Sequence, residues 1–240
     1  MILLIRLILA HLIGDFALQP RSWVEEKETK KAKSIKLYLH ALIHGALALL
    51  LLWDFSCWPL AAVVAVLHLV IDTIKLYSQK EENKTKWFFI DQALHIVSIL
   101  LLLLFVWFSP QIDLSSISLN PNLWVYITAI LFITSVSGIV IQILLSKWSK
   151  SISDDGDDSL ANAGKYIGIL ERLFVFTFIL VGRWEGIGFL LAAKSVFRFG
   201  DLKESKDRKL TEYILIGTLL SFGIAMGIGL ATVKLVSILG

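Results

Sequence analysis

Long runs of Leu, Ile, Val, Ala and Phe alternate with shorter polar segments along the whole chain. Several runs reach the roughly 20 residues that a helix needs to cross a bilayer. The pattern therefore predicts an all-α fold, a polytopic transmembrane helix bundle of about eight membrane helices. We expect these helices near residues 2–19, 37–53, 58–77, 87–108, 122–146, 164–182, 186–200 and 211–237.

The polar segments between these runs differ in charge. Residues 21–36 carry six Lys or Arg among acidic residues; the alternation suggests a surface helix, although a solvated connector is the favoured interpretation. Residues 109–121 contain neither Lys nor Arg. Residues 147–163 hold four aspartates around Gly156 without the alternating ligands and final Glu of a calcium loop, so we interpret them as a flexible linker.

Composition agrees with a membrane protein. Hydrophobic residues make up 56% of the chain, and mean hydropathy is +0.74. The single cysteine, Cys57, excludes an intramolecular disulfide and a thiolate metal cluster. Residues 1–18 lack a small-x-small cleavage site, so we interpret them as the first membrane helix.

Basic residues accumulate on alternate loops. One set carries 17 Lys or Arg, when Lys75 and Lys165 are counted with their neighbouring loops, and the other set carries only Arg183. Because cytoplasmic loops are rich in Lys and Arg, we expect residues 21–36 and the other basic loops in the cytoplasm and both termini outside.

Four pairs of candidate metal ligands stand out against this apolar background. The members of each pair are four residues apart, which places both on one face of a helix. The chain has five histidines, and every one belongs to such a pair. The pairs are His11/Asp15, His40/His44, His68/Asp72 and Asp91/His95.

The expected topology places all four pairs at one depth, in the cytoplasmic third of the membrane. Two pairs end inward-running helices, and two begin outward-running ones. Ionisable groups at this depth cost about 2.5–3.5 kcal/mol each on insertion scales, so they need partners. A shared cation meets this need, and we expect residues 1–109 to form a metal-binding, four-helix half.

The donor set restricts the metal. Eight nitrogen and oxygen ligands exceed the four of a tetrahedral zinc site, so they fit either two metals with bridging carboxylates or one metal with outer partners. Imidazole and carboxylate without thiolate favour a divalent metal, zinc first and manganese or iron as alternatives, and argue against copper(I).

The second half, residues 110–240, has a polar cluster of its own: Glu171, Arg172, Lys194, Arg198 and Glu212. Interhelical ion pairing explains such a cluster. Lys194 and Arg198, which share a helix face, also suit an anionic headgroup or phosphate. We therefore consider Lys194, Arg198 and Arg172 candidate catalytic cations.

Several motifs also carry a resemblance to a known family. They are His11-Leu-Ile-Gly-Asp15-Phe-Ala-Leu-Gln19, His68-Leu-Val-Ile-Asp72-Thr-Ile-Lys75 and Asp91-Gln92-Ala-Leu-His95, with second-half segments around Glu171-Arg172, Lys194 and Glu212. The chain resembles, over nearly its whole length, the bacterial membrane proteins grouped as domain of unknown function 3307. This resemblance implies a multi-pass protein of the bacterial inner membrane and brings no activity with it. A looser likeness, in histidines and aspartates near helix ends, is to predicted membrane-bound metal-dependent hydrolases.

Two function classes follow. The first is a membrane-embedded metal-dependent hydrolase, with a mono- or dinuclear site near the cytoplasmic face, acting on an anionic or lipid-linked, phosphate-containing substrate. The second is a divalent metal-ion transporter using the same residues. Transporter sites often lie at broken helices, and the sequence shows neither a clear repeat nor a Pro/Gly break beside the ligands, so the enzyme is favoured. A redox di-metal enzyme is a weaker third. Membrane lipid is an expected partner and nucleic acid is not.

Overall fold

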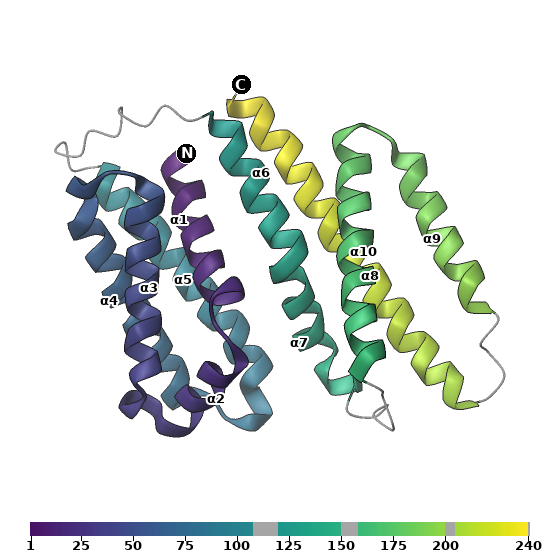
Figure 1. The fold of residues 1–240 in the computed structure, drawn as a ribbon, viewed down its shortest axis with the longest axis horizontal. Coiled ribbons are helices and arrows are strands. Elements are labelled where there is room, and N and C mark those ends of the chain that lie inside the picture. The colour runs from purple at the N-terminus through teal and green to yellow at the C-terminus, as the bar shows by residue number, and fades with distance from the viewer. Residues whose placement is uncertain (108–119, 150–157, 200–204, 240) are drawn as a thin grey trace. The chain divides into compact units, whose positions relative to one another are not determined.

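The computed structural model describes residues 1–107, 120–149, 158–199 and 205–239, and every element in them is a helix (Figure 1). The acidic segment around Gly156 lies outside the described residues. The chain divides into two compact units, Met1–Thr128 and Ala129–Gly240. The division lies inside a helix, beyond the boundary expected between residues 109 and 110.

The first unit is built from four long helices that pack around each other. Helix α3 packs against α1 and α4, and α5 packs against the same two helices. At one end they enclose a core that includes Leu7, Leu52, Leu60 and Ile99. The long elements are α1 (Ile2–Leu12), continued by the π-helix η1 (Ile13–Ala17), α3 (Ile35–Leu52), α4 (Trp58–Ser78) and α5 (Lys84–Trp107).

A short charged helix, α2 (Arg21–Lys30), follows the first span after a bend of 85°. Pro20 lies at this bend in an extended conformation, because its ring cannot continue the preceding helix. Glu28 accepts hydrogen bonds from Gln79 (3.1 Å) and Lys84 (2.9 Å), which fix α2 against the adjacent ends of α4 and α5. The interpretation of residues 21–36 as a solvated connector is therefore wrong, and the surface helix is confirmed.

The second unit continues the helix that begins as α6. Most of α6 (Pro121–Leu131) belongs to the first unit, and only its last turn belongs to the second. The further elements of the second unit are the π-helix η5 (Phe132–Val136), α7 (Ser137–Ser149), α8 (Asp158–Leu180), α9 (Trp184–Phe199) and α10 (Ser205–Leu239). Helix α10 packs against α7 and α8, and α8 packs against α9. Val175, Ile179 and Phe222 lie in its apolar core.

Five helical segments among the described residues are long and apolar enough to cross a membrane, or six if the bent α1–α2 pair counts as one span. The expected count of about eight is not confirmed. Helix α9 has only 16 residues, and α8 carries Lys165, Glu171 and Arg172 within its apolar part. The qualifying segments are Ile35–Leu52, Phe55–Ser78, Glu81–Val106, Pro121–Ser146 and Thr211–Leu239.

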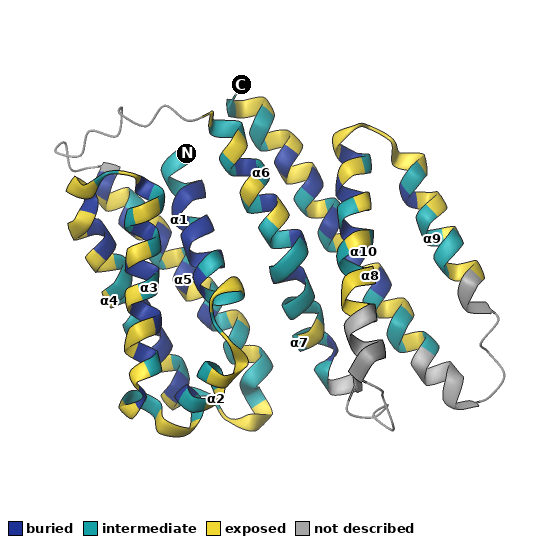
Figure 2. Ribbon diagram, in the orientation of Figure 1, coloured by how far each residue is buried: buried dark blue, intermediate teal, exposed yellow. Residues whose placement is uncertain are grey.

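Large apolar side chains lie on the outside of both units. Exposed positions recur along α3, α4, α8 and α9 (Figure 2). The large exposed side chains include Leu50 of α3, Phe105 of α5 and Phe189 of α9, whose exposed fractions are 59%, 70% and 76%. A water-soluble surface rarely gathers so many, whereas a lipid-facing one does so as a rule. The fold class, an all-α protein of membrane-like helices, is thus confirmed.

Candidate metal centre

Helix α1 carries His11, and the π-helix η1 that continues it carries Asp15, the second member of the first pair of candidate ligands. The amide of Leu18 donates to the carbonyl of Ile13 at 2.9 Å, the i to i+5 spacing of a π-turn. Such single turns often occur at functional sites. Within it, Gly14 faces the ring of His44, and a Cβ atom at this position would lie 2.4 Å from two ring atoms. Only glycine therefore lets α1 and α3 approach closely enough for Asp15 to reach His44.

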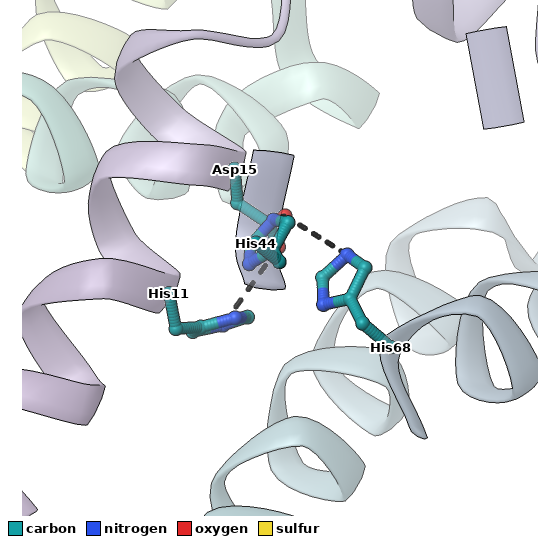
Figure 3. A group of neighbouring side chains, drawn as sticks. All are labelled: His11, Asp15, His44 and His68. Atoms are coloured by element: carbon teal, nitrogen blue, oxygen red, sulfur yellow. Dashed lines mark hydrogen bonds and ion pairs between the residues drawn. The ribbon is translucent and has the colours of Figure 1, made fainter. Parts of the chain in front are cut away.

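The other three pairs come from α3, α4 and α5, and the fold brings all eight candidate ligands into one cluster. The sequence-based expectation that they converge agrees with this geometry. His68 stacks between His44, with ring centroids 3.5 Å apart, and His95, at 4.1 Å. All five histidines are at most 4% exposed. Figure 3 shows the side chains of His11, Asp15, His44 and His68 pointing toward one another from different helices.

In each of the three aspartates one carboxylate oxygen, Oδ1, faces imidazole nitrogens. Oδ1 of Asp15 lies 3.1 Å from Nε2 of both His40 and His44, and 3.6 Å from Nε2 of His68. Oδ1 of Asp72 lies 3.7 Å from Nε2 of His68 and 3.6 Å from Nε2 of His95. Nitrogen and oxygen ligands of one cation are separated by similar distances, so this inner set of atoms suits a metal.

The second oxygen, Oδ2, of each aspartate is held by a polar side chain. Lys27 donates to Oδ2 of Asp72 at 2.7 Å, and Lys75 donates to Oδ2 of Asp91 at 2.8 Å.

Oδ2 of Asp15 accepts from Nε2 of Gln92 at 2.7 Å, while Oε1 of the same amide lies 3.1 Å from Nε2 of His11. Nε2 of Gln19 donates to Nε2 of His40 at 2.9 Å. Outer partners of this kind orient metal ligands in proteins.

Several nitrogen and oxygen atoms of this inner set are buried and lack a hydrogen-bond partner. Within the described part of the chain, Nε2 of His68, Nε2 of His95 and Oδ1 of Asp91 have no hydrogen-bond partner. Buried polar atoms are nearly always paired, because leaving one unpaired costs about 1–3 kcal/mol. Such unpaired atoms fit bound cations: Nε2 of His95 and Oδ1 of Asp91 belong to residues of one possible ligand group, and His68 belongs to two others.

Three overlapping groups of residues could hold an ion, with the ligand atoms of each group within 4.8 Å of one another. Asp15 belongs to two of the groups, so its carboxylate is suited to bridge two positions, and His68 also belongs to two of them. The groups are His11, Asp15, His44 and His68; His40, His68 and Asp72; and Asp15, Asp91 and His95. Both the mono- and the dinuclear interpretation remain compatible with this set.

A cavity of about 20 Å³ lies beside the imidazole rings of His11, His44, His68 and His95. Its remaining wall is mostly apolar and includes Leu7 and Ile99. A space of this size holds one water molecule. A metal on these imidazoles would thus have room for a non-protein ligand, as catalytic metal sites require.

The polar residues of the second unit form contacts of their own. Lys194 donates to Glu171 at 2.7 Å, which joins α9 to α8. Arg172 donates to the carbonyl of Ile133 and to Oγ of Ser221, so the π-helix η5 supplies part of its hydrogen bonding. These contacts agree with interhelical pairing.

Glu212 is exposed on α10, and the side chain of Arg198 lies outside the described residues. The role expected for Lys194, Arg198 and Arg172 on the substrate stays a prediction.

Sequence reasoning missed the outer partners of the cluster. Lys75 is three residues after Asp72, and Gln92 is three residues before His95, so the helical period could have indicated both. Gln19 is the last residue of the motif that begins at His11. No sequence pattern indicated Lys27 as an outer partner, because only the 85° bend after η1 brings α2 across the site.

The expected absence of a break beside the ligands is also wrong. Asp15 lies in a π-helix, and the first span bends shortly after it, at Pro20. Gly14 and Pro20 were visible in the sequence, but the close approach to His44 that requires Gly14 is a tertiary contact.

Fold and site together define a helical protein with several helices of membrane-spanning length and a buried His/Asp cluster. The chain belongs to the family described as "Protein of unknown function (DUF3307)", whose model matches residues 3–125. The match includes all eight candidate ligands, Lys27 and Lys75. The second-half motifs around Glu171, Lys194 and Glu212 lie beyond it, so the resemblance over nearly the whole chain is confirmed only for the first half. No curated protein and no solved structure matched the chain.

Proposed function

We propose that the chain is a membrane-embedded, metal-dependent hydrolase whose centre is the cluster of five histidines and three aspartates in the first unit. Zinc is the first choice and manganese or iron the alternatives, because the donors are imidazole and carboxylate without thiolate. The observation that carries the proposal is the water-sized cavity beside four of the imidazoles. A hydrolase needs a water next to its metal, and this cavity offers the room for one.

The chemistry is the transfer of a phosphoryl or acyl group to water. The metal lowers the pKa of water, so a nucleophile is available near neutral pH. The water oxygen forms a bond to the phosphorus or carbonyl carbon, the bond to the leaving oxygen breaks, and that oxygen takes up a proton. The buried position of the ligands suits a substrate anchored in the membrane, such as a lipid-linked phosphate ester.

The site lies where the chain turns from its first span into the basic helix α2. We place this end at the cytoplasmic face of the bacterial inner membrane, with both termini outside, because the basic loops gather on that side.

A divalent metal transporter remains the second candidate, and one specific observation favours it. Asp15 lies in a π-helix, and the span bends by 85° after it. Broken helices with irregular backbone are typical of ion sites in transporters. Against this, three carboxylates and five imidazoles at one point favour tight retention over release.

Two measurements separate these functions. In sealed vesicles that contain the protein, we expect zinc uptake equal to that of empty vesicles. Directional uptake that is lost in His44→Ala and Asp91→Asn would overturn the hydrolase and support the transporter.

The second measurement is phosphate release from phosphatidate and from a polyprenyl diphosphate in mixed micelles. We expect release by the zinc-loaded wild type and none by His68→Ala. Zinc-loaded protein that hydrolyses neither lipid and also transports no zinc would contradict both functions.

A further inference from the structure

Two lysines reach the candidate metal centre, and they differ in surroundings. Each ammonium group is bonded to Oδ2 of an aspartate, at 2.7 Å for Lys27 and 2.8 Å for Lys75. The side chain of Lys27 is 6% exposed, whereas that of Lys75 is 24% exposed. One cation is therefore enclosed, and the other lies partly open beside the same cluster.

The residues around Lys75 form the accessible edge of the site. Asp15 is the only one of the eight candidate ligands that is not fully buried. Gln92, which bonds Asp15 and also approaches Oδ2 of Asp91 at 3.4 Å, is half-buried too. An incoming ligand would meet Asp15, Gln92 and Lys75 before any histidine.

Two aromatic rings flank this edge. Phe16 and Phe88 contact each other edge to face, with centroids 6.3 Å apart, and both are half-buried. The ammonium of Lys75 lies 5.9 Å from the ring centre of Phe88, within the range of a cation–π contact. Apolar rings next to a cation suit a charged headgroup that is attached to an apolar chain.

From this placement we infer that Lys75 is an anion-binding residue, which receives the phosphate group of the ligand at the edge formed by Asp15, Phe16, Phe88 and Gln92. An ammonium has three donors, and the described contacts use one of them, on Asp91. Lys27 has the different task of holding Asp72 from the enclosed side. The inference rests on the proposed function, since inorganic phosphate is a product of phosphate-ester hydrolysis.

The phosphate can come from a lipid headgroup or from solution, and two titrations distinguish these sources. Zinc-loaded, full-length protein in detergent is titrated with inorganic phosphate and, separately, with dioleoyl phosphatidate in mixed micelles. Binding of both ligands indicates recognition of the phosphate alone. Binding of phosphatidate only indicates a lipid headgroup, with Phe16 and Phe88 against its chain.

Three variants test the residue itself. Lys75→Gln should weaken phosphate or phosphatidate binding by at least about tenfold, because a charged hydrogen bond contributes about 1.5–3 kcal/mol. Lys75→Arg keeps the charge and should stay within about threefold of the wild type, a difference of well under 1.4 kcal/mol. Lys30→Gln is the control, since it removes an equal charge from an exposed ion pair outside the cluster, and it should also stay within that range.

Metal content is measured before each titration. Wild type without bound metal would contradict the proposed centre itself, and so separates that failure from failure of the present inference. Wild type that binds metal but neither phosphate ligand would overturn the inference. So would an equal loss of affinity in Lys30→Gln and Lys75→Gln, or loss of metal from Lys75→Gln, because Lys75 would then only hold Asp91.

Discussion

In each aspartate of the cluster, one carboxylate oxygen faces the imidazoles and the other accepts a hydrogen bond from a Lys or Gln side chain. Oδ1 faces imidazole nitrogens, while Oδ2 is bonded to Lys27, Lys75 or Gln92. This arrangement fixes the carboxylates before any cation binds. A metal then meets oriented ligands, and little conformational entropy remains to be lost on binding.

Loss of inner ligands should empty the centre. We expect wild type purified from metal-replete medium to hold one or two equivalents of a first-row divalent metal, and Asp15→Asn and His68→Ala to hold far less. Asp15 and His68 belong to more than one of the three ligand groups, so each change affects several contacts. Elemental analysis measures this directly, with Asp54→Asn, outside the cluster, as control. Equal, near-zero metal in all proteins would contradict the prediction.

The Lys27–Asp72 pair should make stability depend on metal. Lys27→Met leaves the carboxylate of Asp72, whose side chain is 7% exposed, without its ammonium partner. Breaking a buried pair in this way costs about 3–5 kcal/mol. Thermal unfolding in detergent should show this loss in chelator, and zinc should restore more stability to the variant than to the wild type.

The exposed pair Lys30–Glu26 offers the control, because the side chain of Lys30 is 60% exposed. Lys30→Met should change stability by about 0–1 kcal/mol. An equal effect of the two substitutions, with or without zinc, would show that Lys27 does not neutralise the centre.

At the scale of elements, the sequence predicted the long helices well and their irregularities poorly. Helices such as Ile35–Leu52 and Trp58–Ser78 follow from long, predominantly apolar runs, because lipid requires every backbone group to be bonded within the helix. The i, i+4 spacing also placed both members of each ligand pair on one face. The π-turn at Asp15 and the position of α2 depend on contacts with other helices, which no local pattern encodes.

The π-turn at Asp15 can be tested by substituting Gly14. Gly14→Ala introduces a Cβ atom 2.4 Å from the His44 ring, so the ring must move away from Asp15. We expect lower metal content and a loss of stability of about 1–3 kcal/mol from overpacking. Gly188→Ala is the matched control, since a Cβ atom there meets nothing within 4 Å. Normal metal content in Gly14→Ala would show that the contact with His44 is not needed.

At the scale of the molecule, orientation in the membrane follows from the distribution of charge. We expect residues 21–36, 79–86, 147–163 and 201–210 to face the cytoplasm. A single cysteine at Lys30, in a Cys57→Ala background, should react with a membrane-impermeant maleimide only after the membrane is opened. A single cysteine at Asp54 should react in intact cells. Labelling of position 30 in intact cells would reverse the orientation and place the metal centre at the outer face.

The ammonium groups of Lys27 and Lys75 have a further consequence for how the protein is made. Three carboxylates opposed by two ammoniums leave one net negative charge when the imidazoles are neutral. The chain thus brings most of its own counter-ions into the bilayer as its helices are inserted. Insertion of the helices would therefore not require a bound metal, and an ion could be delivered late, to a finished fold.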